Sequence, residues 1–72
     1  MYKSYIVVTD GENLLSEHRT EVEAQIRMAR EFMEIMDSFH LNGIRPTVNR
    51  SVSNAEVTYG NHHRNLQVLG TY

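Results

Sequence analysis

The side chains best suited to chemistry in this 72-residue chain stand in its last third. His62 and His63 are adjacent, and Arg64 follows them directly. Imidazoles ligate metal ions and move protons, and arginine binds phosphate and carboxylate groups. Neighbouring residues of a strand point to opposite faces, so the two histidines reach one metal ion only if a loop twists them together. Because the chain has no cysteine and no carboxylate at a familiar ligand spacing beside them, we expect solvated histidines and no metal site.

The distribution of charge gives the same region an alternative role. Up to residue 41 the chain carries eight acidic and four basic side chains, whereas Glu56 is the one acidic residue after it. The basic or titratable residues of this C-terminal third are Arg45, Arg50, His62, His63 and Arg64. Together they form a candidate site at which an oligomer would bind an anionic small molecule, a nucleotide or nucleic acid.

No catalytic constellation accompanies these residues. Asp10 stands directly before Gly11, where we expect it to form a turn and not to act as a catalytic acid. No serine or threonine lies in a nucleophile-elbow pattern, and no glycine-rich loop is present to hold phosphates. We therefore expect a protein that is not an enzyme and that uses no cofactor.

One long helix is expected to organise the fold. Residues 20–43 carry the only sustained helical period, with a Thr-x-x-Glu capping box at the start and an Asn-Gly stop signal at the end. Apolar residues also alternate with period two over residues 22–28, so a second start near Gln25 stays open. We favour the start near Glu21 because of the capping box.

This helix has an unusually wide apolar arc. One group of apolar residues comprises Val22, Ile26, Ala29 and Met33. A second group, on another side, comprises Met28, Phe32, Ile35 and Phe39. Either a small core curls round the helix, or one side meets the chain's own sheet and the other meets a second subunit or partner. We favour the latter, and the predicted association surface comprises the second group together with the polar residues Arg27, Arg30 and Glu34.

Short β-branched and apolar segments predict strands on both sides of the helix. The predicted strands span residues 2–9, 13–19, 47–52, 55–59 and 66–69, the last extending towards residue 72. The first is expected to be central and buried on both faces, and the second to be an edge strand joined to it by an Asp-Gly turn. An irregular loop is expected over residues 60–65.

These elements predict an α+β fold class. Residues 1–72 are expected to form a single small domain, in which an antiparallel sheet of three to five strands carries one long helix on one face, in the order ββαβββ. A chain of this length buries only about 60% of its unfolded surface, and without cysteine no disulfide can stabilise it. Self-association as a homodimer or higher oligomer is therefore expected. The absence of a membrane-length apolar stretch and of a signal-peptide pattern predicts a soluble, cytoplasmic protein.

The strand–turn–strand–helix plan resembles the small sheet-plus-helix anti-CRISPR proteins of phages. The residues similar in content and spacing to one such type I inhibitor are Tyr5-Ile6-Val7, Ser16-Glu17, Thr20 and Val22-Glu23-Ala24. The resemblance implies a non-enzymatic inhibitor that binds a nuclease complex of the bacterial host and blocks the access of nucleic acid to it. The contact surface of that inhibitor is rich in lysine and arginine, unlike this helix, so no contact residue carries over.

The expected function is that of a small, self-associating, non-enzymatic binding protein that acts by surface recognition of a larger protein. A phage-type anti-defence inhibitor works in this manner. The alternative is an oligomeric binder of an anionic small molecule or nucleic acid through the C-terminal third. Neither role involves a membrane.

Overall fold

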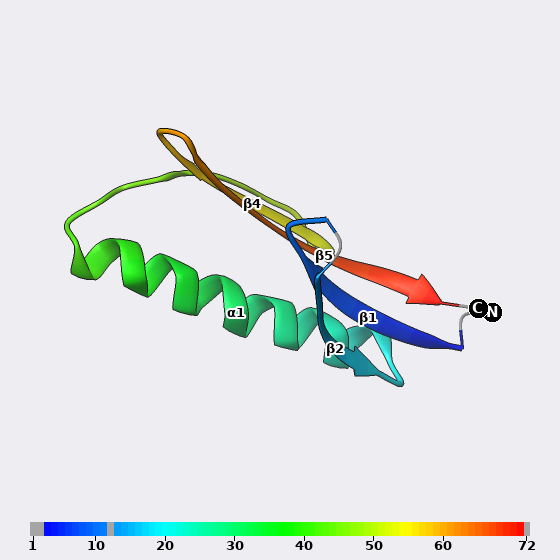
Figure 1. Ribbon diagram of the computed structural model, residues 1–72. Helices are drawn as coiled ribbons and strands as arrows, with labels where there is room; N and C mark the ends of the chain where they lie inside the picture. Colours follow the sequence, from blue (N-terminus) through cyan, green and yellow to red (C-terminus); the bar gives the residue numbers. More distant parts are fainter. Residues whose placement is uncertain (1–2, 12, 72) are drawn as a thin grey trace.

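The computed structural model describes residues 3–11 and 13–71 and shows a two-layer α+β fold (Figure 1). Its elements are β1 (Ser4–Thr9), β2 (Asn13–His18), α1 (Glu21–Leu41), β3 (Thr47–Arg50), β4 (Asn54–Tyr59) and β5 (His62–Thr71). All neighbouring strands are antiparallel, in the spatial order β2-β1-β5-β4-β3. The predicted fold class and the order ββαβββ are confirmed.

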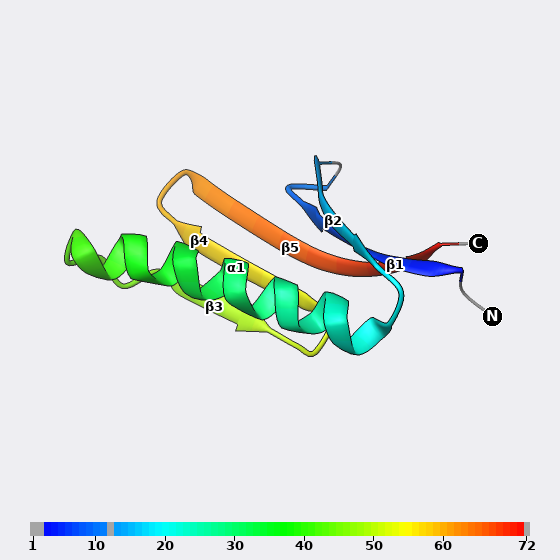
Figure 2. The ribbon, with the colours of Figure 1, turned by 90° about the horizontal axis from the view of Figure 1, so that it is seen from below.

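The pairing of β1 with β5 joins the two ends of the chain into one sheet. It runs from Ser4 opposite Thr71 to Thr9 opposite Leu66. The other three pairs are hairpins between consecutive strands, so this pairing alone bridges the parts of the sheet before and after α1 (Figure 2).

The turn after β1 has the conformation that its Asp-Gly sequence favours. Asp10 and Gly11 have φ angles of 51° and 90°, and aspartate and glycine tolerate this left-handed region better than most residues. Asp10 also makes two hydrogen bonds to Asn65 of β5: its N–H donates to the Asn65 carbonyl at 2.8 Å, and its Oδ1 accepts from the Asn65 N–H at 3.1 Å. The turn therefore fixes the position of the β1–β2 hairpin against β5.

The helix begins at Glu21, as the capping-box argument favours. Thr20 is extended, and its Oγ1 accepts a hydrogen bond from the Glu23 N–H at 3.2 Å. At the other end Gly43 adopts a φ of 71°, and its N–H donates to the carbonyl of His40 at 3.0 Å. This is a left-handed stop of the kind that the Asn-Gly pair predicts.

The core lies between α1 and the sheet face that the helix covers (Figure 1). Its buried members are Val7, Ala24, Met28, Phe32, Ile35, Ala55, Val57 and Leu66. Val8, next to Val7 in β1, faces the opposite side of the sheet and is also buried. Ile6, on the same face as Val8, is only half-buried, so the prediction that the first strand is buried on both faces holds for Val7 and Val8 but not for the whole strand.

Three predictions about the sheet need correction: the strand at its middle, the extent of the loop before the last strand, and the end of the third strand. The middle strand is β5, with β1 one place from it. The predicted loop over residues 60–65 is mostly strand, because β5 begins at His62 and pairs with β4 from the turn onwards. β3 ends at Arg50, two residues earlier than predicted. The expected extensions to residues 2 and 72 lie outside the described residues.

The fold leaves two broad surfaces without a covering layer. The molecule measures 42 by 19 by 18 Å, and one helix and one sheet make up its two layers (Figure 2). The outer side of α1 and the far face of the sheet therefore face solvent. Within the described ranges, no helix is both long enough and apolar enough to cross a membrane.

Candidate functional site

The helix residues predicted to meet a partner lie instead in the chain's own core. Met28, Phe32 and Ile35 are buried between α1 and the sheet. Phe39 is partly buried, packs against the same cluster and makes an edge-to-face contact with Tyr59, with ring centres 6.2 Å apart. This half of the predicted association surface is wrong, because the sheet covers the side of the helix that these residues occupy.

The opposite side of α1 carries a row of apolar residues exposed to solvent, which we call the outer ridge. Its members are Val22, Ile26, Ala29 and Met33. The exposed fractions of Val22, Ile26 and Met33 are 63%, 56% and 61%, while Ala29 is half-buried. The wide apolar arc therefore has one side on the sheet and one side free, but the free side is the first apolar group and not the second.

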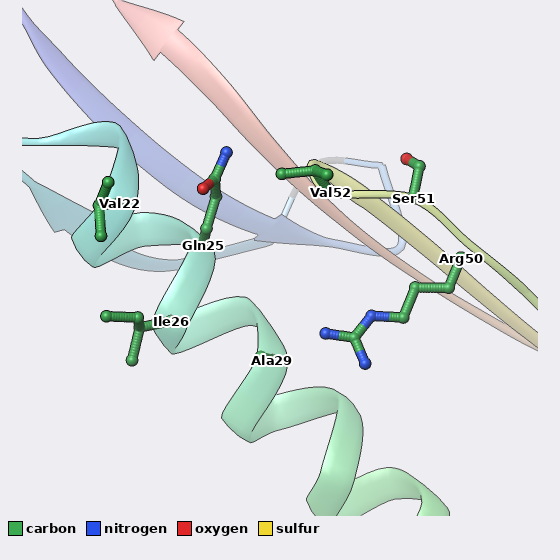
Figure 3. Close-up of a pocket in the computed structure, with 7 residues that line it drawn as sticks. All are labelled: Val22, Gln25, Ile26, Ala29, Arg50, Ser51 and Val52. Atoms are coloured by element: carbon green, nitrogen blue, oxygen red, sulfur yellow. The ribbon is translucent and has the colours of Figure 1, made fainter.

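A groove runs beside the outer ridge, between α1 and the end of β3. It has a volume of about 560 Å³ and is lined by Val22, Gln25, Ile26, Ala29, Arg50, Ser51 and Val52. Figure 3 shows Arg50 extending from β3 towards the helix, while Ile26 points away from Arg50 and the β3–β4 turn. Val52 is 69% exposed. The apolar surface of the ridge therefore continues across the groove onto the β3–β4 turn.

The other flank of the ridge is charged. A smaller hollow of about 230 Å³ on this side is lined by His18, Glu23, Ile26, Arg27 and Arg30. Arg27 is paired with Glu31 at 3.0 Å, whereas Glu23 and Arg30 are exposed. Arg19 and Glu34 are exposed as well, so the predicted polar contacts Arg30 and Glu34 remain accessible.

The structure brings His62 and Arg64 to one hollow, which Glu34 of α1 also lines, but it does not bring all five basic residues of the C-terminal third into one site. Arg50 lies over the ring of Phe32, with its Cζ 4.7 Å from the ring centre. Arg64 Nε is 3.3 Å from Asp10 Oδ2. Arg45 lies in the loop before β3 and is exposed. Two of the three arginines thus already have partners, Arg50 on α1 and Arg64 in the turn after β1.

The two adjacent histidines point to opposite faces of the sheet. His62 stands opposite Tyr59 and His63 opposite Thr58 in the β4–β5 ladder, and facing residues alternate sides along a strand. Both are exposed. Among the described residues no group of three or more His, Asp or Glu side chains is placed to hold a metal ion.

A second apolar surface lies on the open face of the sheet, and the sequence interpretation did not identify it. Ile6 stands opposite Leu69, and Val8 stands opposite Leu14, so their side chains share the face away from α1. Leu14 and Leu69 are both exposed. The alternation of Ile6 and Val8 with the core residue Val7 was the available signal.

The fold and these surfaces define a small α+β protein with exposed apolar surfaces on both layers. Comparisons of the chain with models of protein families, with curated proteins and with solved structures find no match.

Proposed function

We propose that this protein is a non-catalytic binding protein that self-associates through the outer ridge of α1 and acts by surface recognition of a larger protein. The observation that carries the proposal is the exposure of Val22, Ile26 and Met33 in one row. Single exposed apolar residues are ordinary, but a continuous exposed apolar surface is typical of an interaction site. Val52 extends this row across the groove.

The size of the domain supports self-association. Apart from Val8, the buried apolar residues of the described ranges form one small cluster on one side of the sheet, and the chain has no cysteine to form a stabilising disulfide. Burying the outer ridge against another surface would remove further apolar area from water, at about 25 cal/mol per Å².

The helix is a better association surface than either edge of the sheet. The edge strand β3 has only four residues, follows Pro46 and ends in Arg50. The other edge, β2, has an irregularity in its pairing with β1 between Val7 and Val8. Short strands, proline, charge and bulges are the features with which edges avoid pairing with another chain.

Association through α1 would leave the open face of the sheet free to contact a larger protein. Leu14 and Leu69 provide exposed apolar surface there. The resemblance to anti-CRISPR proteins adds one class of partner to test, a nuclease complex. The separation of the basic residues favours this proposal over the anion-binding alternative.

Light scattering coupled to size-exclusion chromatography tests the proposal. We expect a mass above that of the 8.4 kDa chain, rising with concentration, and a return to the monomer mass for Ile26→Asp. Leu14→Asp is the matched control, since it places the same charge at an exposed apolar residue on the open face. A monomer at all concentrations, or an oligomer that tolerates Ile26→Asp, would contradict the proposal.

A further inference from the structure

We infer that the partner on the outer ridge is a second copy of this chain, whose α1 lies antiparallel to the first about a two-fold axis passing between Ile26 and Arg27. The inference rests on the proposed function and adds to it the occupant, the direction and the register. The described charges on the flank of the ridge carry the argument.

The spacing of the ridge suits a helix as its partner. Val22, Ile26, Ala29 and Met33 follow one another at intervals of four, three and four residues. This is the spacing with which the seam of a helix pair packs side chains of one helix between those of the other. The small side chain of Ala29 lets a facing helix approach closely. With the axis beside Ile26, Val22 would pack between the partner's Ala29 and the partner's Met33.

The charged flank determines the direction. On this flank Glu23 and Arg30 are exposed and opposite in charge, and both line the hollow beside the ridge, where Arg27 is paired with Glu31. In an antiparallel helix pair, equivalent flanks face each other, whereas in a parallel pair each flank faces the other helix's opposite flank. A parallel pair would therefore place these charges against the groove side of the partner, which is lined by Gln25, Arg50 and Val52 and offers no acidic side chain to Arg30.

The same charges determine the register. Glu23 and Arg30 lie at equal distances on either side of the proposed axis. The two-fold axis thus places Glu23 beside the partner's Arg30. Symmetry repeats this pair, so two attractive pairs flank the seam. Each exposed pair adds little energy, but together they disfavour registers that bring like charges together.

The arrangement forms a closed dimer. A two-fold contact uses the same surface on both copies and leaves no second ridge to recruit a third chain. In an antiparallel pair the two groove sides also face each other, so Val52 and Gln25 would lie at the margin of the interface. The open faces of the two sheets remain accessible.

Single cysteines provide the first test, because the natural chain has none. In the proposed register Ile26→Cys places two thiols beside the axis, within disulfide reach, and we expect a covalent dimer on mild oxidation. Met33→Cys places its two thiols about 20 Å apart along the helix axis, at 1.5 Å per residue, and we expect no covalent dimer. A parallel pair would cross-link at both positions.

Charge reversal provides the second test. Glu23→Arg and Arg30→Glu each replace two attractive pairs with two repulsive ones, and we expect each to raise the dimer dissociation constant about 10-fold or more. The double variant Glu23→Arg/Arg30→Glu restores opposite charges and should recover most of the affinity. Glu21→Arg is the control: it reverses a charge in the same first turn of α1, but on a different side of the helix.

The outcomes separate this inference from the proposed function. Suppose that Ile26→Asp dissociates the dimer, but that it cross-links through both cysteine positions or through Met33→Cys alone. This result would overturn the register and leave the proposed function standing. The same holds if the double charge variant is weaker than both single variants. A protein that is monomeric at all concentrations would overturn both.

Discussion

The guanidinium group of Arg50 lies over the ring of Phe32, with Cζ 4.7 Å from the ring centre. Arg50 is the last residue of the edge strand β3, and Phe32 lies at the margin of the core on α1. The contact therefore joins the edge of the sheet to the helix beneath the groove. Arg50, which the sequence suggested as an anion-binding residue, is therefore already engaged in a contact within the fold.

Replacing Arg50 tests whether this contact stabilises the fold. A cation over an aromatic ring contributes about 0.5–1 kcal/mol at an exposed site, so we expect Arg50→Ala to lower the free energy of unfolding by this amount. Urea denaturation followed by circular dichroism measures the change. Arg45→Ala is the control, since it removes an exposed arginine from the loop before β3, and its effect should stay within about 0.5 kcal/mol. Equal effects of the two variants would mean that the ring contact contributes nothing measurable.

A pair of methionines tests which side of α1 is the core. Met28 is 1% exposed and Met33 is 61% exposed. Truncating a buried methionine to alanine costs about 2–5 kcal/mol, a large part of the stability of a small domain. We therefore expect Met28→Ala to be strongly destabilising and Met33→Ala to have almost no effect on the monomer.

The measurement requires a protein concentration low enough that association adds nothing to stability. Urea midpoints at two concentrations establish this condition. If Met33→Ala destabilised the monomer as much as Met28→Ala, the side of the helix assigned to the core would be wrong.

The parts of the fold that depend on local chemistry could be predicted from the sequence. The Thr20 cap, the Asn-Gly stop and the Asp-Gly turn each involve a few neighbouring residues, and the structure contains all three. The start of β5 was missed because His62 and His63 have no apolar alternation. Pairing with β4 makes them a strand, and that pairing depends on the whole hairpin.

For a similar reason, the sequence prediction assigned the wrong apolar group of α1 to the free surface. Both apolar groups have helical spacing, so spacing alone cannot tell which one the sheet covers. The order of the strands decides it, since β1 and β5 pack against one side only. One local signal was available: Ala24 extends the second group by four residues towards the start of the helix, and so makes it the longer row.

The helix cap at Thr20 should contribute measurably to stability. Its Oγ1 accepts from the Glu23 N–H, and replacing a capping threonine by alanine costs about 0.5–2 kcal/mol. We expect Thr20→Ala to lose roughly 1 kcal/mol in urea denaturation monitored at 222 nm. Thr20→Asp keeps a capping oxygen and places a negative charge at the positive end of the helix dipole, so it should retain most of the stability. Equal losses in both variants would show that the cap is not the cause.

Substitutions of Asp10, which forms an ion pair with Arg64, separate the contribution of charge to stability from that of turn geometry. Both side chains are more than one-third exposed, so the ion pair itself should contribute under about 1 kcal/mol. Asp10→Asn keeps an oxygen for the Asn65 N–H and tolerates the φ of 51°, so it should lose only the charge contribution. That loss should disappear in about 1 M salt, where the Debye length falls to about 3 Å.

Asp10→Ala removes the acceptor as well, and it places in the left-handed region a residue without the polar side chain that lets aspartate and asparagine tolerate it. We therefore expect a larger loss, of about 1–3 kcal/mol, that salt does not relieve. Urea denaturation of both variants at low and high salt gives the four values needed. If Asp10→Asn stayed destabilised at high salt, the cause would lie in the hydrogen bond to β5, and the turn would anchor the β1–β2 hairpin without help from the charge of Arg64.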